Sequence, residues 1–257
     1  MNVTTYTPTD ALKPFIKHYL VIESDQGVIN RLLPDTSVVL VFRYKGNLNY
    51  TAGGIETNIP VSVLTGLKKS SRLVNYSAGS AAILVIFKTA AAISFFKVPL
   101  HELFEDSVPL YNFIGCQHAA DMEEQLSALK DNFERINLIE QFLLSQIKST
   151  ASDKLVLAAV EKMYAANGFY KMKDLANSLY ISQDAFEKRF RKAAGASPKQ
   201  FSSIIRLRNV ITAGKQQQNF TGIAYDAGYF DQAHFNKDFR LFTGQTPTDF
   251  FEAPIFW

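Results

Sequence analysis

A pattern of sixteen residues occurs twice in the C-terminal part of the chain, 49 residues apart, and this repeat limits the fold more than any other feature. Phe186–Phe201 and Phe235–Phe250 share the pattern F-x-K-x-F-R-x(3)-G-x-[ST]-P-x(2)-F. The first two Phe of each copy are four residues apart and share one apolar helix face. The glycine suits a left-handed helix end, and the Ser-Pro or Thr-Pro pair suits the start of another helix. Each copy therefore predicts a helix, a stop and a second helix.

A further short helical segment precedes each copy. These segments are Asp174–Leu179 and Gly222–Ala227, and a turn separates them from the repeated helices that begin near Ser182 and Asp231. A helix, a short turn and a second helix form a helix-turn-helix unit. The sequence predicts two such modules, about 171–195 and 219–243, joined by a long helix of about 198–217.

Positive charge is concentrated in the same region. The whole chain carries a net charge of +3. Residues 1–150 have 13 Lys+Arg and 14 Asp+Glu, whereas residues 151–257 have 14 and 10. Lys188–Tyr225 contains eight basic residues and no acid. Such a surface suits a phosphate backbone, although a solvated helix surface explains charge alone equally well.

The first hundred residues predict short strands, because Val, Ile, Leu, Phe and Tyr runs alternate with Gly, Pro, Asn and Asp turns. The expected strands are 15–22, 37–44, 61–64, 72–76 and 81–87. A short helix is expected from an N-cap at Thr89 through Lys97, followed by helices 119–130 and 135–148. The predicted fold class is α+β: an antiparallel sheet or small barrel with helices in residues 1–150, and an all-α tandem helix-turn-helix region in residues 151–257.

The sequence lacks the signals that mark several classes of protein function. The longest apolar run, Ala81–Phe87, is far shorter than the roughly 18 residues of a membrane span. The N-terminus has no signal-peptide pattern, so a cytoplasmic protein is expected. Cys116 stands alone and is expected to be a small buried residue; neither a disulfide framework nor a Cys/His metal site is predicted. Nucleotide-binding loops and a nucleophile elbow are also missing, so no catalytic residue, metal or cofactor is predicted, and the chain is not expected to be an enzyme.

Helical periodicity separates a buried stripe from an outward face on each repeated helix. The outward residues are Gln183, Asp184, Glu187, Lys188 and Arg191 on the first helix, and Gln232, Ala233, Asn236, Lys237 and Arg240 on the second. Lys188 can donate hydrogen bonds to guanine, Gln183 can pair with adenine and Glu187 can accept a hydrogen bond from cytosine. Ala233 can contact a thymine methyl group. Arg191, Lys192 and Arg240 suit phosphates, although solvated surface is an alternative for such long basic side chains.

Residues of about 152–251 resemble the DNA-binding region of the AraC/XylS family of bacterial transcription regulators. The resemblance implies two helix-turn-helix modules that place a helix in successive major grooves, with base contacts at Gln183, Asp184, Glu187 and Lys188. The chain departs from the family pattern at Tyr180, at Ala213-Gly214 and at Gly222. Glycines in or near helices favour a softened connector, because each costs about 1 kcal/mol relative to Ala.

Scattered N-terminal segments resemble one type of domain that accompanies these modules. They are Tyr6–Pro8, Leu33–Asp35, Thr65-Gly66 and Phe95–Phe104. The resemblance implies a domain that senses a small molecule or dimerises the protein. The region contains aromatic and cationic residues that suit the lining of a ligand pocket: Arg31, Arg43, Tyr44, Tyr50 and Tyr76. At strand spacing, the same residues also suit an ordinary sheet face. No ligand-binding residue is assigned.

The leading hypothesis is a sequence-specific DNA-binding transcriptional regulator. Its expected partners are double-stranded DNA, a small-molecule effector, a second copy of the chain and RNA polymerase, without a membrane. One alternative is a protein-interaction or architectural regulator with degenerate DNA contacts. Another is an enzyme with an attached DNA-binding region, such as a DNA-alkylation repair protein, for which one cysteine is too few.

Overall fold

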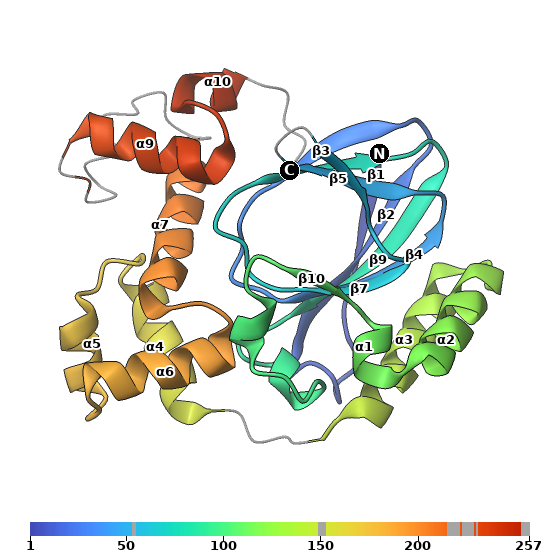
Figure 1. Ribbon diagram of the computed structural model, residues 1–257, viewed down its shortest axis with the longest axis horizontal. Coiled ribbons are helices and arrows are strands. Elements are labelled where there is room, and N and C mark those ends of the chain that lie inside the picture. The colour runs from blue at the N-terminus through green and yellow to red at the C-terminus, as the bar shows by residue number, and fades with distance from the viewer. Residues whose placement is uncertain (53–54, 149–152, 215–221, 223–228, 230, 253–257) are drawn as a thin grey trace.

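The chain folds into a β-rich N-terminal part and a helical C-terminal part that lie side by side (Figure 1). The structure, a computed structural model, describes residues 1–52, 55–148, 153–214, 222, 229 and 231–252. Within these residues, no helix is both long and apolar enough to span a bilayer. The predicted α+β fold class is confirmed.

Two antiparallel sheets build the N-terminal part. One has six strands in the order β1-β2-β9-β4-β7-β10 and the other has four in the order β3-β8-β5-β6. The strands are β1 Asn2–Tyr6, β2 Ile16–Ser24, β3 Val28–Leu32, β4 Val39–Lys45, β5 Leu48–Ala52, β6 Ile55–Asn58, β7 Ser62–Thr65, β8 Arg72–Tyr76, β9 Ser80–Phe87 and β10 Ser107–Pro109. The central strand β9 is almost wholly buried, which explains its continuous apolar sequence.

The five predicted strands are present as β2, β4, β7, β8 and β9, whereas the other five were not predicted. β1 and β6 are mostly exposed and lack an apolar face. The helix predicted from Thr89 to Lys97 was wrong. The segment forms turns and one short 3-10 helix, η1 Ala92–Ser94, because Ala90 adopts a positive φ of 61° that interrupts a helical path.

Three helices cover one side of the sheets: α1 Tyr111–Ile114, α2 Cys116–Ala128 and α3 Asn132–Gln146 (Figure 1). Buried Glu140 of α3 accepts hydrogen bonds from the Tyr19 hydroxyl at 3.0 Å and the Thr9 amide at 2.9 Å, which ties α3 to β2. The expectation of a buried Cys116 was wrong, because the thiol lies exposed on the first residue of α2.

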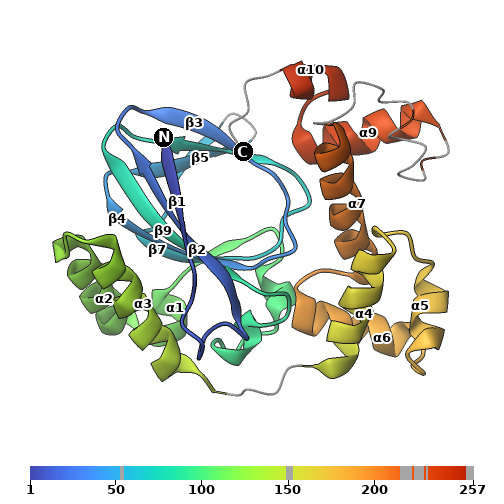
Figure 2. The same ribbon diagram turned by 180° about the vertical axis from the view of Figure 1, so that it is seen from behind.

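The C-terminal part is helical, and Figure 2 shows it from the opposite side. Its helices are α4 Lys154–Ala165, α5 Met172–Ser178, α6 Gln183–Ala194, α7 Pro198–Gly214, α9 Gln232–Thr243 and α10 Pro247–Glu252. α5 and α6 form the first predicted module, and α7 leads from it to α9 (Figure 1). The first helix predicted for the second module, 222–227, falls outside the described residues except for Gly222, as do Gly228 and residues 215–217 of the connector.

The sequence repeat persists in the hydrogen bonds of the two modules. Ser182 and Asp231 cap α6 and α9 by accepting from the amides of Ala185 and His234. α6 ends at Gly195 with φ 86° and α9 at Gly244 with φ 78°, so both glycines adopt the predicted left-handed conformation. Each next helix is then capped by an equivalent hydroxyl: Ser197 accepts from Gln200 N, and Thr246 from Asp249 N.

The departures from the family pattern have local explanations. Tyr180 adopts a positive φ of 56° in the turn between α5 and α6, and its side chain is 98% exposed. Gly214 lies beneath the ring of Phe251, where an added Cβ would approach a ring carbon to 2.2 Å. At Gly214 the missing side chain makes room for an aromatic ring that packs on α7, and the expected softness of the connector stays a prediction.

Candidate nucleic-acid interface and its attachment to the sheets

The first recognition helix, α6, buries one stripe and exposes the face predicted to read DNA. Phe186 and Phe190 are fully buried and contact each other edge to face. Gln183, Asp184, Glu187, Lys188, Arg191 and Lys192 are all exposed. Arg189 on the flank of α6 pairs with Asp153 at 2.6 Å, which joins this helix to the N-cap of α4.

The second helix, α9, repeats this arrangement. Phe235, Phe239 and Phe242 are buried, whereas Gln232, Ala233, Asn236, Lys237 and Arg240 are exposed. Asp238 lies 3.6 Å from His234 on the side of the helix. Both predicted outward faces are therefore free of the helical core, as a major-groove contact requires.

Two predicted DNA contacts of α6 lie next to the N-terminal part. Glu187 and Arg191 line a hollow of about 180 Å³ together with His101 and Phe104. His101 belongs to the 3-10 helix η2 Leu100–Leu103, which packs against α6. DNA that reached Arg191 would therefore pass close to the N-terminal part.

The two recognition helices are fastened to the N-terminal part at their C-terminal ends, in different ways. At the end of α6, Gly195 faces Leu100 and Leu67, and a Cβ there would lie 3.4 Å from both side chains. At the end of α9, the carbonyl of Thr243 accepts hydrogen bonds from Arg31 Nη1 at 2.7 Å and Ser71 Oγ at 2.8 Å. The Ser71 amide also donates to the carbonyl of Phe242 at 2.7 Å.

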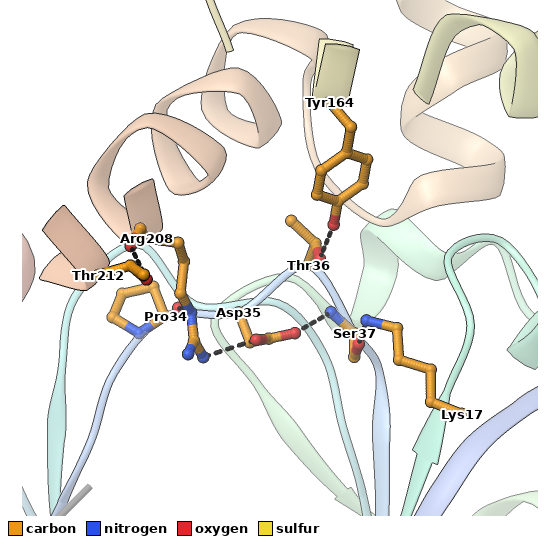
Figure 3. A network of polar contacts seen from close by, with 8 residues as sticks. All are labelled: Lys17, Pro34, Asp35, Thr36, Ser37, Tyr164, Arg208 and Thr212. Carbon is orange, nitrogen blue, oxygen red and sulfur yellow. Dashed lines mark hydrogen bonds and ion pairs between the residues drawn. The ribbon is translucent and has the colours of Figure 1, made fainter. Parts of the chain in front are cut away.

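The connecting helix α7 is fastened by Arg208, as Figure 3 shows. Arg208 Nη2 lies 2.6 Å from Asp35 Oδ2, and its Nε donates to the Pro34 carbonyl at 2.9 Å. Burial of Asp35 opposes its ionisation, but Arg208, Lys17 and hydrogen bonds from Ser37 together lower the pKa of the carboxyl. Asp35 is therefore held ionised against the connector.

A second contact joins α4 to the same loop. The hydroxyls of Tyr164 and Thr36 are 2.6 Å apart (Figure 3). This hydrogen bond and the ion pair of Arg208 together fix the loop between β3 and β4 to α4 and α7.

A cavity of about 490 Å³ lies between the two sheets, and its lining includes Arg208. Of the residues suggested as pocket material, Arg31, Tyr50 and Tyr76 line it, whereas Arg43 and Tyr44 do not. Tyr44 instead donates to Glu23 at 3.1 Å. Sequence reasoning missed Lys17, Lys68, Arg72 and Arg208 as lining residues, because they come from three segments far apart in the chain, with only Lys68 and Arg72 close together.

The described residues define a class of protein: a β-sheet part attached to a helical part in which α7 connects the helix-turn-helix pair α5–α6 with the repeated helix α9. Residues 175–253 match a family described as a helix-turn-helix domain, and residues 4–109 match a domain of unknown function, DUF6597. The predicted resemblance to the AraC/XylS family is confirmed, with the match lying in the helix-turn-helix region.

Two curated relatives match about the same length of this chain. An uncharacterized HTH-type transcriptional regulator of Haemophilus influenzae is 28% identical over 115 residues, which cover 44% of this chain and 38% of the relative. The Msm operon regulatory protein of Streptococcus mutans is 27% identical over 117 residues, 44% of this chain and 42% of the relative. The matched region thus spans about two fifths of these relatives' length.

Solved structures that align with this chain over most of its length include ToxT from Vibrio cholerae O395. It has a TM-score of 0.45 and 17% identity, and the match covers 93% of this chain and 97% of ToxT. The AraC-like transcriptional activator CuxR has a TM-score of 0.26 and 12% identity, with 82% and 85% of the two chains covered.

Proposed function

We propose that this protein is a sequence-specific DNA-binding transcription regulator, in which α6 and α9 read consecutive major grooves and the N-terminal domain senses a small molecule. The observation that carries the proposal is the duplication itself. Capping bonds, left-handed glycines and buried Phe stripes recur at a shift of 49 residues, and each copy leaves one polar face exposed. Duplicated recognition helices suit a duplex whose grooves recur every helical turn.

The connecting helix has a length that fits this role. α7 has 17 residues, which rise about 25 Å along the helix axis. Adjacent major-groove segments on one face of DNA are about 34 Å apart. A connector of this length, extended by the modules at its ends, supports binding to two consecutive grooves.

The roles of individual residues belong to the same proposal. Gln183, Asp184, Glu187 and Lys188 of α6, with Gln232, Ala233, Asn236 and Lys237 of α9, contact bases, whereas Arg191 and Arg240 contact phosphates. The domains divide at residues 150 and 151, with modules at about 171–195 and 219–243. A second copy of the chain and RNA polymerase are further partners of such a regulator.

Regulation by the N-terminal domain follows from the contacts at the helix ends. Because both α6 and α9 end on the N-terminal part, a shift of that part changes the spacing or tilt of the two recognition helices. The hollow between η2 and Arg191 adds a steric limit on the approach of DNA to α6. The cavity between the sheets is the place for an effector, since ligand sites are typically cavities of roughly 300–1,000 Å³.

DNA selection followed by footprinting tests the proposal. We expect a selected sequence whose protected region covers two consecutive major grooves, and an affinity that falls steeply and linearly in log K against log[salt]. If no DNA sequence is enriched and the protected region varies in length, the result would instead support the architectural alternative. A flat salt response would contradict both.

The residue roles are tested by a matched pair on α9. Lys237→Ala should relax preference at particular base pairs by about 1–3 kcal/mol, because it removes a base contact. Arg240→Ala should weaken binding to all sequences alike and reduce the salt slope by about one. If both variants weaken all sequences equally, Lys237 is a phosphate contact and the assignment is wrong.

A further inference from the structure

A hollow of about 440 Å³ lies within the helical part, where the segment that leads from α4 into α5 meets the connecting helix. Residues 168–172 form one wall of this α7 hollow. The other wall is one face of α7, which carries Lys199, Ser202 and Arg206 at spacings of three and four residues. Gly168 adopts a φ of 78°, and an added Cβ would lie 2.4 Å from the Ser202 carbonyl oxygen. The two walls are therefore in direct contact at the base of the segment.

The α7 hollow is lined by positive charge. Its cationic residues are Lys171, Lys199 and Arg206, and its lining contains no Asp or Glu. None of the three forms an ion pair with another residue that the structure describes. Lys171 and Lys199 are exposed, whereas Arg206 is partly buried. Their charges are thus left without a counter-charge at this place.

Arg206 is held in position without using all of its hydrogen-bond donors. Its Cζ lies 5.5 Å from the centre of the Phe169 ring and 5.9 Å from that of Tyr229. Its Nη2 donates to Ser203 Oγ at 3.3 Å. Its Nε is buried and has no hydrogen-bond partner among the described residues. Because a buried charged donor without an acceptor is costly, this nitrogen marks a place for an acceptor.

Ser202 carries a second donor of this kind on the same face of α7. Its side chain is only 2% exposed, and its hydroxyl has no hydrogen-bond partner in the described part of the chain. The neighbouring Ser203, by contrast, donates to the Lys199 carbonyl one turn earlier at 3.0 Å, as hydroxyls in helices commonly do. A buried hydroxyl without a bond is less favourable than a methyl group, so packing alone does not explain a serine here.

The α7 hollow also lies beside the junction of the two modules. α7 leads from the first module at one end to α9 at the other (Figure 1). Arg206 stands beside Phe169, which precedes α5, and beside Tyr229, which precedes α9. A duplex read by α6 and α9 carries its backbone from one major groove to the next along the same connector. A backbone phosphate is thus one anion that this junction can meet.

We propose that the α7 hollow binds a phosphate group, with Arg206 and Ser202 as hydrogen-bond donors and Lys171 and Lys199 as further positive charges. A phosphate offers several acceptor oxygens and matches the fork of a guanidinium, whereas a carboxylate offers two oxygens and a single charge. The volume lies in the range of small-molecule sites, roughly 300–1,000 Å³. The phosphate therefore belongs either to the DNA backbone or to a free phosphorylated compound. Use of the site by DNA rests on the proposed function, whereas phosphate binding itself does not.

Inorganic phosphate is the probe for the site. Isothermal titration calorimetry on the full chain, at low ionic strength, should show saturable binding at a single site. Acetate at the same ionic strength should bind about ten-fold more weakly, because it forms at least one charged hydrogen bond fewer. Absence of saturable phosphate binding would overturn the site, and equal affinities for acetate and phosphate would overturn the ligand class.

Matched variants locate the phosphate. Arg206→Met and Ser202→Ala should each weaken phosphate binding by about ten-fold, because each removes a hydrogen bond to a charged group. Lys171→Met should weaken it as well, whereas Lys173→Met, on the same segment but outside the lining, should leave it unchanged. Circular dichroism melting establishes that each variant is folded. Ser202→Ala should be as stable as the unmodified chain, since its hydroxyl has no partner to lose. Equal phosphate affinities of Ser202→Ala, Arg206→Met and Lys173→Met would refute the location.

DNA binding separates the two sources of the phosphate. If a backbone phosphate occupies the hollow, Arg206→Met should reduce the slope of log K against log[salt] by about one. Inorganic phosphate, compared with chloride at equal ionic strength, should then weaken DNA binding by the unmodified chain but not by Arg206→Met. If both slope and competition are unchanged while phosphate still binds, the occupant is a free phosphorylated compound. Selection of no DNA sequence with intact phosphate binding refutes the proposed function alone, and specific DNA binding without phosphate binding refutes this inference alone.

Discussion

The two modules share a sequence pattern but differ in how they are attached to the N-terminal part. The end of α6 meets apolar side chains, those of Leu67 and Leu100, whereas the end of α9 meets polar donors, those of Arg31 and Ser71. Apolar contacts are lost only when buried surface returns to water. Hydrogen bonds to a helix-end carbonyl can be exchanged for bonds to water, at a net cost of about 1 kcal/mol for a neutral donor such as Ser71 and about 1.5–3 kcal/mol for the charged Arg31.

This difference suggests a division of labour. Within the proposed function, α6 is then expected to be the fixed reader and α9 the one that the N-terminal domain releases. Arg208 connects both roles, because it holds the connecting helix at a loop that also borders the cavity. The two modules are thus expected to be equally stabilised by their Phe cores and unequally fixed by their contacts with the N-terminal part.

The largest effects are expected from the shared Phe stripe. Phe190→Ala and Phe239→Ala each remove a fully buried ring and should each lower the free energy of unfolding by about 3–5 kcal/mol. Urea unfolding of both variants measures this. A much smaller loss in one variant would show that the two cores are not equivalent.

Weakening the contact between α9 and the N-terminal part should have a smaller effect, and this effect should be confined to the end of α9. Arg31→Met removes a charged donor from Thr243, which costs about 1.5–3 kcal/mol of attachment. Hydrogen exchange at Ser71 should become roughly ten-fold faster or more. The amides of η2 beside α6 should not change; their acceleration would mean that the two attachments open together.

The smallest effect is expected from acid. The pKa of Asp35 is lowered in the folded protein, so its contribution is present above the ordinary carboxyl pKa near 4 and lost as pH falls through the folded value. Because Asp35 and Arg208 are each about two fifths exposed, the contribution is about 1 kcal/mol or less. Stability measured from pH 6 to pH 3 should fall less in Asp35→Asn than in the unmodified chain. Identical curves would show that the pair adds nothing.

Much of the helical part was predictable because its signals are local. Phe spacing, a left-handed glycine and a capping hydroxyl act within a few residues, so α6 and α9 follow from the sequence. The short strands β1 and β6 escaped prediction because they are mostly exposed. The break at Ala90 escaped prediction because alanine rarely adopts a positive φ, so no local signal marks it.

By itself, the sequence determined that a helix with a defined outward face, a left-handed glycine and a second capped helix occur twice, as α6 and α7 and as α9 and α10. Only the tertiary structure decided what holds each copy and what surrounds the cavity. Lys17, Lys68, Arg72 and Arg208 come from three separate segments, since Lys68 and Arg72 are close in the chain, and no local pattern distinguishes them from surface charges. They share a place because two sheets and a helix bring them to the lining of one largely apolar space.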